Sequence, residues 1–174
     1  SGTDRCAEAL DALQKSENQN YDLVVNIQGD EPFIDPGQIR QLLGLFDDPL
    51  AQIGTLASEI TRAEEISDPN KPKLVTDIND FALMFSRSPL PYLRGFNLNE
   101  WINRQKFLKH IGIYAFLPEV LMEITKLPPS ELEIAESLEQ LRWLQNGYRI
   151  KIGLTKKENI GIDTPEDLEK IRHK

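Results

Sequence analysis

The stretch YDLVVNIQGDEP, residues 21–32, decides how the fold of this chain is interpreted. It begins as a near-continuous apolar run, which is typical of a strand buried on both faces of a parallel sheet. The run then gives way to Gln28, Gly29 and Asp30, and an acidic residue and a proline follow. A polar surface turn explains this ending. So does a ligand site at the carboxyl end of a strand, where open parallel sheets bind their ligands.

Helical and strand patterns alternate along the rest of the chain. We expect helices at 3–14, 36–46, 61–66, 118–124, 130–146 and from 164 onward, and strands at 21–27, 53–60, 73–76, 82–86, 110–116 and 150–154. The strands at 73–76 and 82–86 predict a hairpin around Asn79 and Asp80. The alternation predicts an α/β fold, a mostly parallel sheet flanked by helices with an inserted β-hairpin, in a single domain spanning residues 1–174.

The composition narrows the class of protein. The chain has 174 residues, 40% of them apolar and 28% charged, with a net charge of −8 and an isoelectric point near 4.9. This acidic balance disfavours nucleic acid or an anionic membrane as a partner, because neutralising phosphate requires Lys and Arg. The one cysteine, Cys6, excludes a disulfide framework and fits a reducing compartment. No run approaches the roughly 20 apolar residues of a membrane span, so we expect a cytoplasmic protein.

A second predicted strand is also followed by an aspartate. In GIDTPEDL, Thr164 can cap the next helix and Pro165 fits its first position, so Asp163 is not needed as the cap. If the strands before Asp30 and Asp163 are parallel neighbours, both carboxylates meet at one edge of the sheet. Two such carboxylates suit Mg²⁺ that also binds substrate phosphate. Turns in which each aspartate bonds nearby backbone amides are the alternative.

Further polar groups lie on or beside predicted strands. In KHIGIY, His110 and Tyr114 share one face with Gly112, which suggests the wall of a groove. His110 could bind a ligand or shuttle a proton, although a satisfied structural histidine is the plainer interpretation. In FSRSP, Arg87 follows a strand and suits bidentate binding of a carboxylate or phosphate. A surface arginine fits equally well.

Two helical segments carry weaker signals. In ESLEQLR, Glu139 and Gln140 flank the apolar stripe in the middle of a predicted helix, where a solvated face is the default. In SGTDR, residues 1–5, Arg5 could meet an anion. A helix N-terminus with Thr3 as its cap explains most of that pattern.

The segments SGTDR, NIQGDEP, FSRSPLPY, KHIGIYAF, ESLEQLR and GIDTPEDLEKI, in this order from Ser1 to Ile171, resemble the 3-deoxy-manno-octulosonate (KDO) cytidylyltransferases, also called CMP-KDO synthetases. The resemblance implies a nucleotide-diphospho-sugar transferase-like (Rossmann-like) fold. It also implies the reaction of CTP with KDO to give CMP-KDO and pyrophosphate, which activates the sugar for lipopolysaccharide synthesis. The anomeric hydroxyl of KDO would attack the α-phosphorus in line, with Mg²⁺ offsetting the developing charge.

The resemblance also implies roles for single residues. The catalytic and Mg²⁺-binding carboxylates would be Asp30 and Asp163, and the nucleotide-proximal residues Ser1, Gly2 and Arg5. The sugar contacts would come from Gln28, Arg87, His110, Tyr114, Glu139 and Gln140. An arginine suits KDO because this sugar carries a carboxylate. Homodimers are usual in the family, so we expect a homodimer here and no nucleic-acid or membrane partner.

One departure from the family pattern bears on activity. The family normally begins with a strand and a basic loop that supply an arginine and a lysine to the triphosphate, and nothing similar precedes Ser1. We therefore expect a partial nucleotidyltransferase domain whose leading strands are missing. An exposed sheet edge would favour association, and the chain alone would be weakly active or inactive.

Other functions stay open. A relative that activates sialic acid or another acidic sugar would carry the same paired aspartates. A degenerate nucleotide- or sugar-binding module would bind its ligand without releasing pyrophosphate. A third alternative is a structural subunit of a hetero-complex. Its only support is that the leading segment usual in the family has no counterpart in this sequence.

Overall fold

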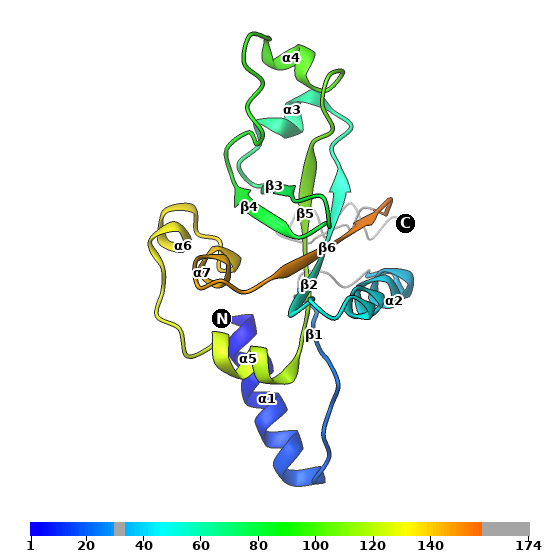
Figure 1. Ribbon diagram of the computed structural model, residues 1–174, viewed down its shortest axis with the longest axis vertical. Coiled ribbons are helices and arrows are strands. Elements are labelled where there is room, and N and C mark those ends of the chain that lie inside the picture. The colour runs from blue at the N-terminus through cyan, green and yellow to red at the C-terminus, as the bar shows by residue number, and fades with distance from the viewer. Residues whose placement is uncertain (30–33, 158–174) are drawn as a thin grey trace, which may run out of the picture.

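A six-stranded sheet forms the centre of the computed structural model, which describes residues 1–29 and 34–157 (Figure 1). Its strands are β1 (Val24–Asn26), β2 (Ile53–Glu59), β3 (Lys73–Thr76), β4 (Ala82–Ser86), β5 (Leu108–Phe116) and β6 (Ile150–Thr155). They are ordered β4-β3-β5-β2-β6, and β1 also pairs with β5. The strand β5 is therefore the centre of the sheet, with three neighbours along its length.

Short helices surround this sheet. They are α1 (Gly2–Glu17), α2 (Pro36–Gly44), α3 (Ala63–Ile66), α4 (Leu98–Trp101), α5 (Pro118–Ile124), α6 (Glu131–Glu136) and α7 (Gln140–Gln145), with a 3₁₀ turn, η1 (Leu45–Asp47), after α2. In the part of the chain that the structure describes, no helix is long and apolar enough to cross a membrane. The helices α3 and α4 lie at one end of the molecule, and α1 extends to the other (Figure 1).

The sheet is mixed rather than mostly parallel, which corrects the expectation from the sequence. β5 runs antiparallel to β1, β2 and β3, and β3 runs antiparallel to β4. Only β2 and β6 pair in parallel among the described strands. The apolar run suggested a parallel strand, but it arises because both faces of β1 are covered. Val24 packs in the cluster beside α1, and Val25 packs in the cluster beside α2. Burial of both faces makes a strand continuously apolar, whatever its direction.

The strand β1 is also shorter than the predicted strand at 21–27. It pairs with β5 through Val24 opposite Phe116 and Asn26 opposite Tyr114. Because β1 and β2 both oppose β5, and β6 parallels β2, these three strands run in the same direction, and β1 ends level with Thr55 of β2 and Ile152 of β6. However, β5 and β2 lie between β1 and β6. The strands before Asp30 and Asp163 are thus not neighbours.

Alternate residues of β5 lie on two faces, as the sequence predicted, and each face packs in a hydrophobic core. Tyr114 and Phe116 join a cluster with buried residues of α1, α5 and α7. Ile111 and Ile113 join a second cluster on the opposite face, with Leu42 of α2. Each apolar side chain buried in this way contributes roughly 1.5–3 kcal/mol, so β5 is held firmly from both faces. The polar groups that β5 carries are fixed with it.

The helix predicted at 130–146 is in fact two helices. Ser130 and Glu133 form the predicted capping box at the start of α6. Ser137 then adopts a left-handed φ of 50°, and the next amide donates to the Glu133 carbonyl over 3.3 Å, which closes α6. A new helix, α7, follows and ends before Gly147, the predicted terminator. Glu139 is consequently the N-cap residue of α7 and not a mid-helix residue.

The inserted hairpin is confirmed. Asp77 Oδ1 accepts hydrogen bonds from the amides of Asn79 (2.9 Å) and Phe81 (2.8 Å) between β3 and β4. Asp80 takes the left-handed conformation, with φ of 59°, which aspartate tolerates better than most residues. The second strand ends at Ser86, just before the proline-containing segment, because proline donates no hydrogen bond to a sheet.

The cap of the first helix differs from the prediction. Ser1 is the N-cap of α1, and its Oγ accepts a hydrogen bond from the Asp4 amide over 3.2 Å. Thr3 lies inside the first turn and is only 3% exposed. Its hydroxyl is therefore free of the capping role and available for a tertiary contact.

Candidate active site

The two predicted metal ligands, Asp30 and Asp163, lie outside the described residues. The segments that flank them contact one another. Asp35 and Lys157 form an ion pair, and the Gln38 side chain donates to the Lys157 carbonyl over 3.3 Å. The hydrogen bond from Lys157 holds the pKa of the Asp35 carboxyl below its usual value, with help from the Gly37 amide. Within 1–29 and 34–157, no group of at least three His, Cys, Asp or Glu side chains could hold a metal ion.

The N-terminus of α1 lies against the end of β1. If Gly2 carried a Cβ atom, that atom would be 3.4 Å from the side-chain nitrogen Nδ2 of Asn26 and 3.4 Å from the side-chain amide of Gln28. Asn26 is buried, and its Nδ2 has no hydrogen-bond partner among the described residues. The structure thus brings the predicted sugar contact Gln28 beside the predicted nucleotide-proximal Gly2. Ser1 and Arg5 lie on the same first turn, and both are exposed.

His110 lies on β5 as a neutral imidazole. Its Nε2 is 3.0 Å from Thr55 Oγ1, and that hydroxyl donates to the Ile113 carbonyl over 2.7 Å. Because the single hydroxyl proton is used there, His110 Nε2 is the donor to Thr55, and Nδ1 keeps its lone pair. Burial of the ring lowers the pKa of His110 to about 4. At neutral pH the residue is therefore suited to accept a hydrogen bond at Nδ1.

Tyr114 is the next polar group along the same face of β5. Its ring centroid is 5.2 Å from that of His110 and 5.2 Å from that of Trp143 on α7. Burial, and then the negative charge of Glu139, raise the pKa of Tyr114 well above its ordinary value. The phenol therefore stays protonated and can donate a hydrogen bond.

The start of α7 supplies a carboxylate and an amide. Glu139 Oε2 accepts a hydrogen bond from Thr3 Oγ1 over 2.7 Å, and Glu139 Oε1 accepts one from Arg142 over 3.0 Å. Gln140 is 5% exposed, and its Nε2 finds no partner among the described residues. A buried amide donor without a partner is uncommon, because it forfeits its hydrogen bonds to water. Neither side chain belongs to the solvated helix face that sequence pattern alone would suggest.

Arg87 binds the end of α6. Its Nε donates to the Glu136 carbonyl (2.6 Å), and its terminal nitrogens donate to the carbonyls of Ser137 (3.2 Å) and Pro69 (2.8 Å). In return the Glu136 carboxylate accepts from Ser86 Oγ and from the Arg87 amide. These bonds use three of the five N–H groups of a guanidinium. The predicted contact of Arg87 with a sugar carboxylate stays a prediction.

Sequence reasoning overlooked several residues that shape this site. Thr55 orients His110, Trp143 packs on Tyr114, and Arg142 and Thr3 hold Glu139. A threonine within the apolar strand at 53–60 was a detectable signal, since a buried hydroxyl needs a partner. Arg142 three residues after Glu139 was another, because side chains at that spacing meet on a helix.

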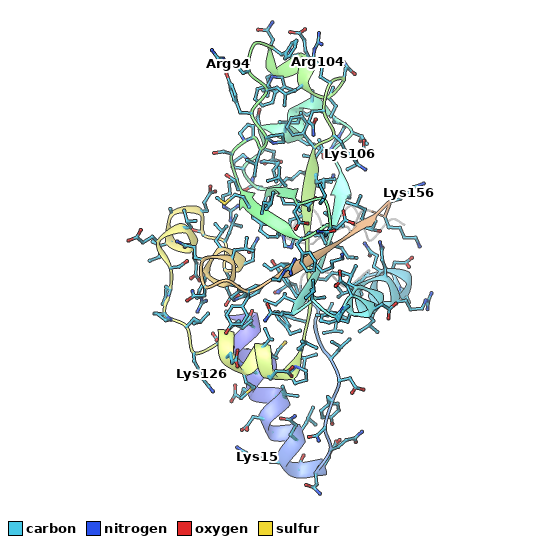
Figure 2. The ribbon with its side chains drawn as sticks, in the orientation of Figure 1. Lys15, Arg94, Arg104, Lys106, Lys126 and Lys156 are labelled. Carbon is cyan, nitrogen blue, oxygen red and sulfur yellow. The ribbon has the colours of Figure 1, made fainter. Side chains whose placement is uncertain are left out.

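The predicted site residues that the structure describes do not line the cavity beside β2 and β6. This cavity, of about 670 Å³, lies at the carboxyl ends of β2 and β6 and is lined by Ser58, Glu59, Thr61, Lys106, Leu154, Thr155 and Lys156. Lys106 and Lys156 extend outward there (Figure 2). The predicted residues Gly2, Gln28, Tyr114 and Glu139 gather instead where α1, β1, β5 and α7 meet. A wall with a neutral imidazole, a phenol, a carboxylate and amides suits a ligand rich in hydroxyl groups.

Known proteins are similar to this chain in sequence. A family model described as cytidylyltransferase matches residues 1–171. Proteins named 3-deoxy-manno-octulosonate cytidylyltransferase are 52% identical over 174 residues in Parabacteroides distasonis and 53% identical over 173 residues in Porphyromonas gingivalis. Each alignment covers 98% of this chain, and the chain spans 68% and 66% of those two relatives.

Solved structures agree with these relatives. One is described as CMP:2-keto-3-deoxy-manno-octonic acid synthetase complexed with CTP. It is 40% identical, superposes with a TM-score of 0.85, and is aligned over 99% of this chain and 67% of its own. A glucose-1-phosphate thymidylyltransferase from Bacillus anthracis, 18% identical with a TM-score of 0.53 over 96% of this chain and 59% of its own, shares the fold alone.

Proposed function

This chain belongs to the cytidylyltransferase family, among the 3-deoxy-manno-octulosonate cytidylyltransferases, and from that premise we propose that it activates KDO with CTP. The anomeric oxygen of KDO would bond to the α-phosphorus of CTP and lose its proton. The bond from that phosphorus to the bridging oxygen would break, and pyrophosphate would leave. The observation that carries the proposal is the convergence of Gly2, Gln28, Tyr114 and Glu139 where α1, β1, β5 and α7 meet.

The described side chains have the hydrogen-bonding character that a polyhydroxylated sugar requires. Glu139 accepts at both oxygens, His110 accepts at Nδ1, and Tyr114 donates. Gln140 contributes a buried Nε2 that lacks a partner among the described residues. A sugar hydroxyl that bonds this amide would remove an unfavourable buried group, which favours binding in this orientation.

Arg87 would take the carboxylate of KDO. Three of its five N–H groups hold backbone carbonyls among the described residues, and the other two would bind the ligand. The bonds to the end of α6 fix the plane of the guanidinium. A guanidinium fixed in this way loses little conformational entropy when it binds an anion.

We propose that Asp30 and Asp163 would hold Mg²⁺. Support comes from the ion pair of Asp35 with Lys157, which joins the segments beside both aspartates. When bound, the ion would orient the triphosphate and offset negative charge. Ser1, Gly2 and Arg5 would lie on the nucleotide side of the site.

The setting of the enzyme is part of the proposal. We propose a cytoplasmic homodimer that makes CMP-KDO for lipopolysaccharide synthesis, with CTP and KDO as its small-molecule partners and neither nucleic acid nor membrane. The hairpin supports a dimer contact, because Ile78 is 99% exposed and Leu83 is 62% exposed. Exposed apolar side chains close together favour association.

The test uses the longest natural polypeptide that contains this chain. We expect Mg²⁺-dependent release of pyrophosphate from CTP with KDO and not with sialic acid. Asp30→Asn and Asp163→Asn should each reduce turnover at least about 100-fold without unfolding. Asp22→Asn, at an exposed position before β1, is the matched control.

Two results would contradict the proposal. Turnover with sialic acid alone would assign a different acidic sugar. A folded protein that binds CTP but releases no pyrophosphate with either sugar would be a binding module.

A further inference from the structure

A part-buried hydrogen bond joins the helix α1 to the N-cap residue of α7. Thr3 Oγ1 donates to Glu139 Oε2 over 2.7 Å, although 136 residues separate the two positions. Thr3 is 3% exposed, so water does not compete for its hydroxyl. The bond is charge-assisted, and such bonds are shorter and stronger than bonds between neutral groups.

A second donor holds the other oxygen of the same carboxylate. Arg142 donates from one terminal nitrogen to Glu139 Oε1 (3.0 Å) and to Glu133 Oε1 (2.9 Å), and from the other to the Leu127 carbonyl (2.9 Å). Arg142 is 9% exposed. Its guanidinium is therefore anchored on α6 and on the segment before it, and cannot follow Glu139 if that side chain moves.

The two donors leave Glu139 with one orientation. Each carboxylate oxygen has one partner among residues 1–29 and 34–157, and it keeps acceptor capacity for a second hydrogen bond. An unrestrained glutamate loses rotamer freedom when it is ordered, and this loss opposes binding. Here that ordering is completed on folding, before any ligand binds.

We propose that Thr3 and Arg142 are positioning residues that fix the Glu139 carboxylate for its hydrogen bonds to sugar hydroxyls. The inference rests on the proposed function and extends it to two residues outside the predicted site. Thr3 thereby links the nucleotide-proximal turn of α1 to the sugar side of the site. Its substitution should alter sugar binding and leave CTP binding nearly unchanged.

The experiment measures KM for each substrate in the longest natural polypeptide that contains this chain. Thr3→Val keeps the shape of the side chain and removes the donor, and it should raise KM for KDO about 5- to 10-fold. KM for CTP should change less than about twofold. Thr3→Ser restores the hydroxyl and should return KM for KDO to within about twofold of the wild type. Thr125→Val, which removes a hydroxyl bonded to the Leu121 carbonyl in α5, is the matched control.

A double-mutant cycle separates positioning from a general effect on structure. In a Glu139→Ala background, Thr3→Val should add less than about twofold, because the group it positions is gone. Arg142→Lys should show the same dependence on Glu139. The lysine can hold one of the three acceptors that Arg142 bonds, and it cannot hold all of them. Arg142→Lys replaces Thr3→Val in the cycle if thermal unfolding shows that Thr3→Val does not fold.

Specific outcomes would overturn the inference. One is an equal rise in both KM values, which would place Thr3 in the nucleotide site or in the general fold. Another is an undiminished effect of Thr3→Val in the Glu139→Ala background. Absence of turnover by the wild-type protein with KDO would instead overturn the proposed function, and the inference with it. The wild-type measurement distinguishes the two failures.

Discussion

His110 Nε2 donates a hydrogen bond to Thr55 Oγ1 over 3.0 Å, and that hydroxyl donates its own hydrogen bond to the Ile113 carbonyl over 2.7 Å. The register shift in the β2–β5 pairing, between Thr55 and Leu56, makes this chain of bonds possible. The extra residues of β5 leave carbonyls of the strand unpaired with β2 and within reach of the threonine. A distortion of the sheet therefore sets the tautomer of the histidine that faces the proposed sugar site.

Protonation of His110 should destabilise the protein in mild acid. The folded pKa is about 4, whereas an unfolded histidine titrates near 6.5. Between these values the unfolded state binds more protons, so the free energy of unfolding should fall as the pH falls through this window. The slope reaches at most about 1.4 kcal/mol per pH unit. In urea unfolding at pH 7 and pH 5, the wild type should lose about 1–2 kcal/mol more than His110→Gln. Equal losses would show that the ring is not desolvated.

Glu65 should be a determinant of stability away from the site. Its carboxylate is 3% exposed and meets Lys109 (2.8 Å), Lys71 (3.0 Å) and Arg62. Burial alone would raise the pKa of Glu65, but hydrogen bonds from these cations outweigh it and lower the pKa to about 2. Glu65→Gln should reduce the free energy of unfolding by about 2–4 kcal/mol, since it leaves clustered positive charge without its counterion.

The control for Glu65 is Glu64→Gln, because the Glu64 side chain is 72% exposed. It should change stability by less than about 0.5 kcal/mol. The contribution of Glu65 should persist above pH 4.5 and disappear as the pH falls toward 2, because its folded pKa is lowered. A Glu65→Gln protein as stable as the wild type at pH 7 would contradict this account.

Arg87→Lys should impair both folding and sugar binding. A lysine cannot satisfy three carbonyls in different directions, so we expect a loss of about 1–3 kcal/mol in the free energy of unfolding. KM for KDO should rise about tenfold if the remaining N–H groups bind the sugar carboxylate. Arg94→Lys is the control, because Arg94 extends outward at the far end of the molecule (Figure 2). A stability loss with unchanged KM for KDO would restrict Arg87 to a structural role.

Ser137→Gly should stabilise the junction between α6 and α7. Ser137 has a φ of 50°, a conformation that glycine adopts without strain. We expect a gain of about 0.5–1 kcal/mol, measured by urea unfolding. Ser130→Ala, which removes the N-cap of α6, should lower stability by about 1 kcal/mol in the same assay. A loss of stability in Ser137→Gly would show that the left-handed turn is not strained.

Several features of the fold were predictable because they depend on neighbouring residues. The capping box of Ser130 and Glu133, the stop at Gly147 and the turn at Asp80 follow from local backbone chemistry, and all were found where expected. The division of β5 into two faces also held, since alternation along a strand is a local property. The break at Ser137 was missed, because serine in a left-handed conformation leaves no distinctive sequence signal.

The sequence by itself determined where most helices and strands lie. It could not determine strand direction, because an apolar strand covered on both faces looks the same in parallel and antiparallel sheets. Only the tertiary structure decided that β5 opposes its three neighbours, and that Thr3 and Glu139 meet across 136 positions. The physical reason is the distance along the chain over which each kind of interaction acts. Caps, turns and alternation act over a few residues, whereas the partners of a buried hydroxyl or carboxylate are set by the order in which the strands pair.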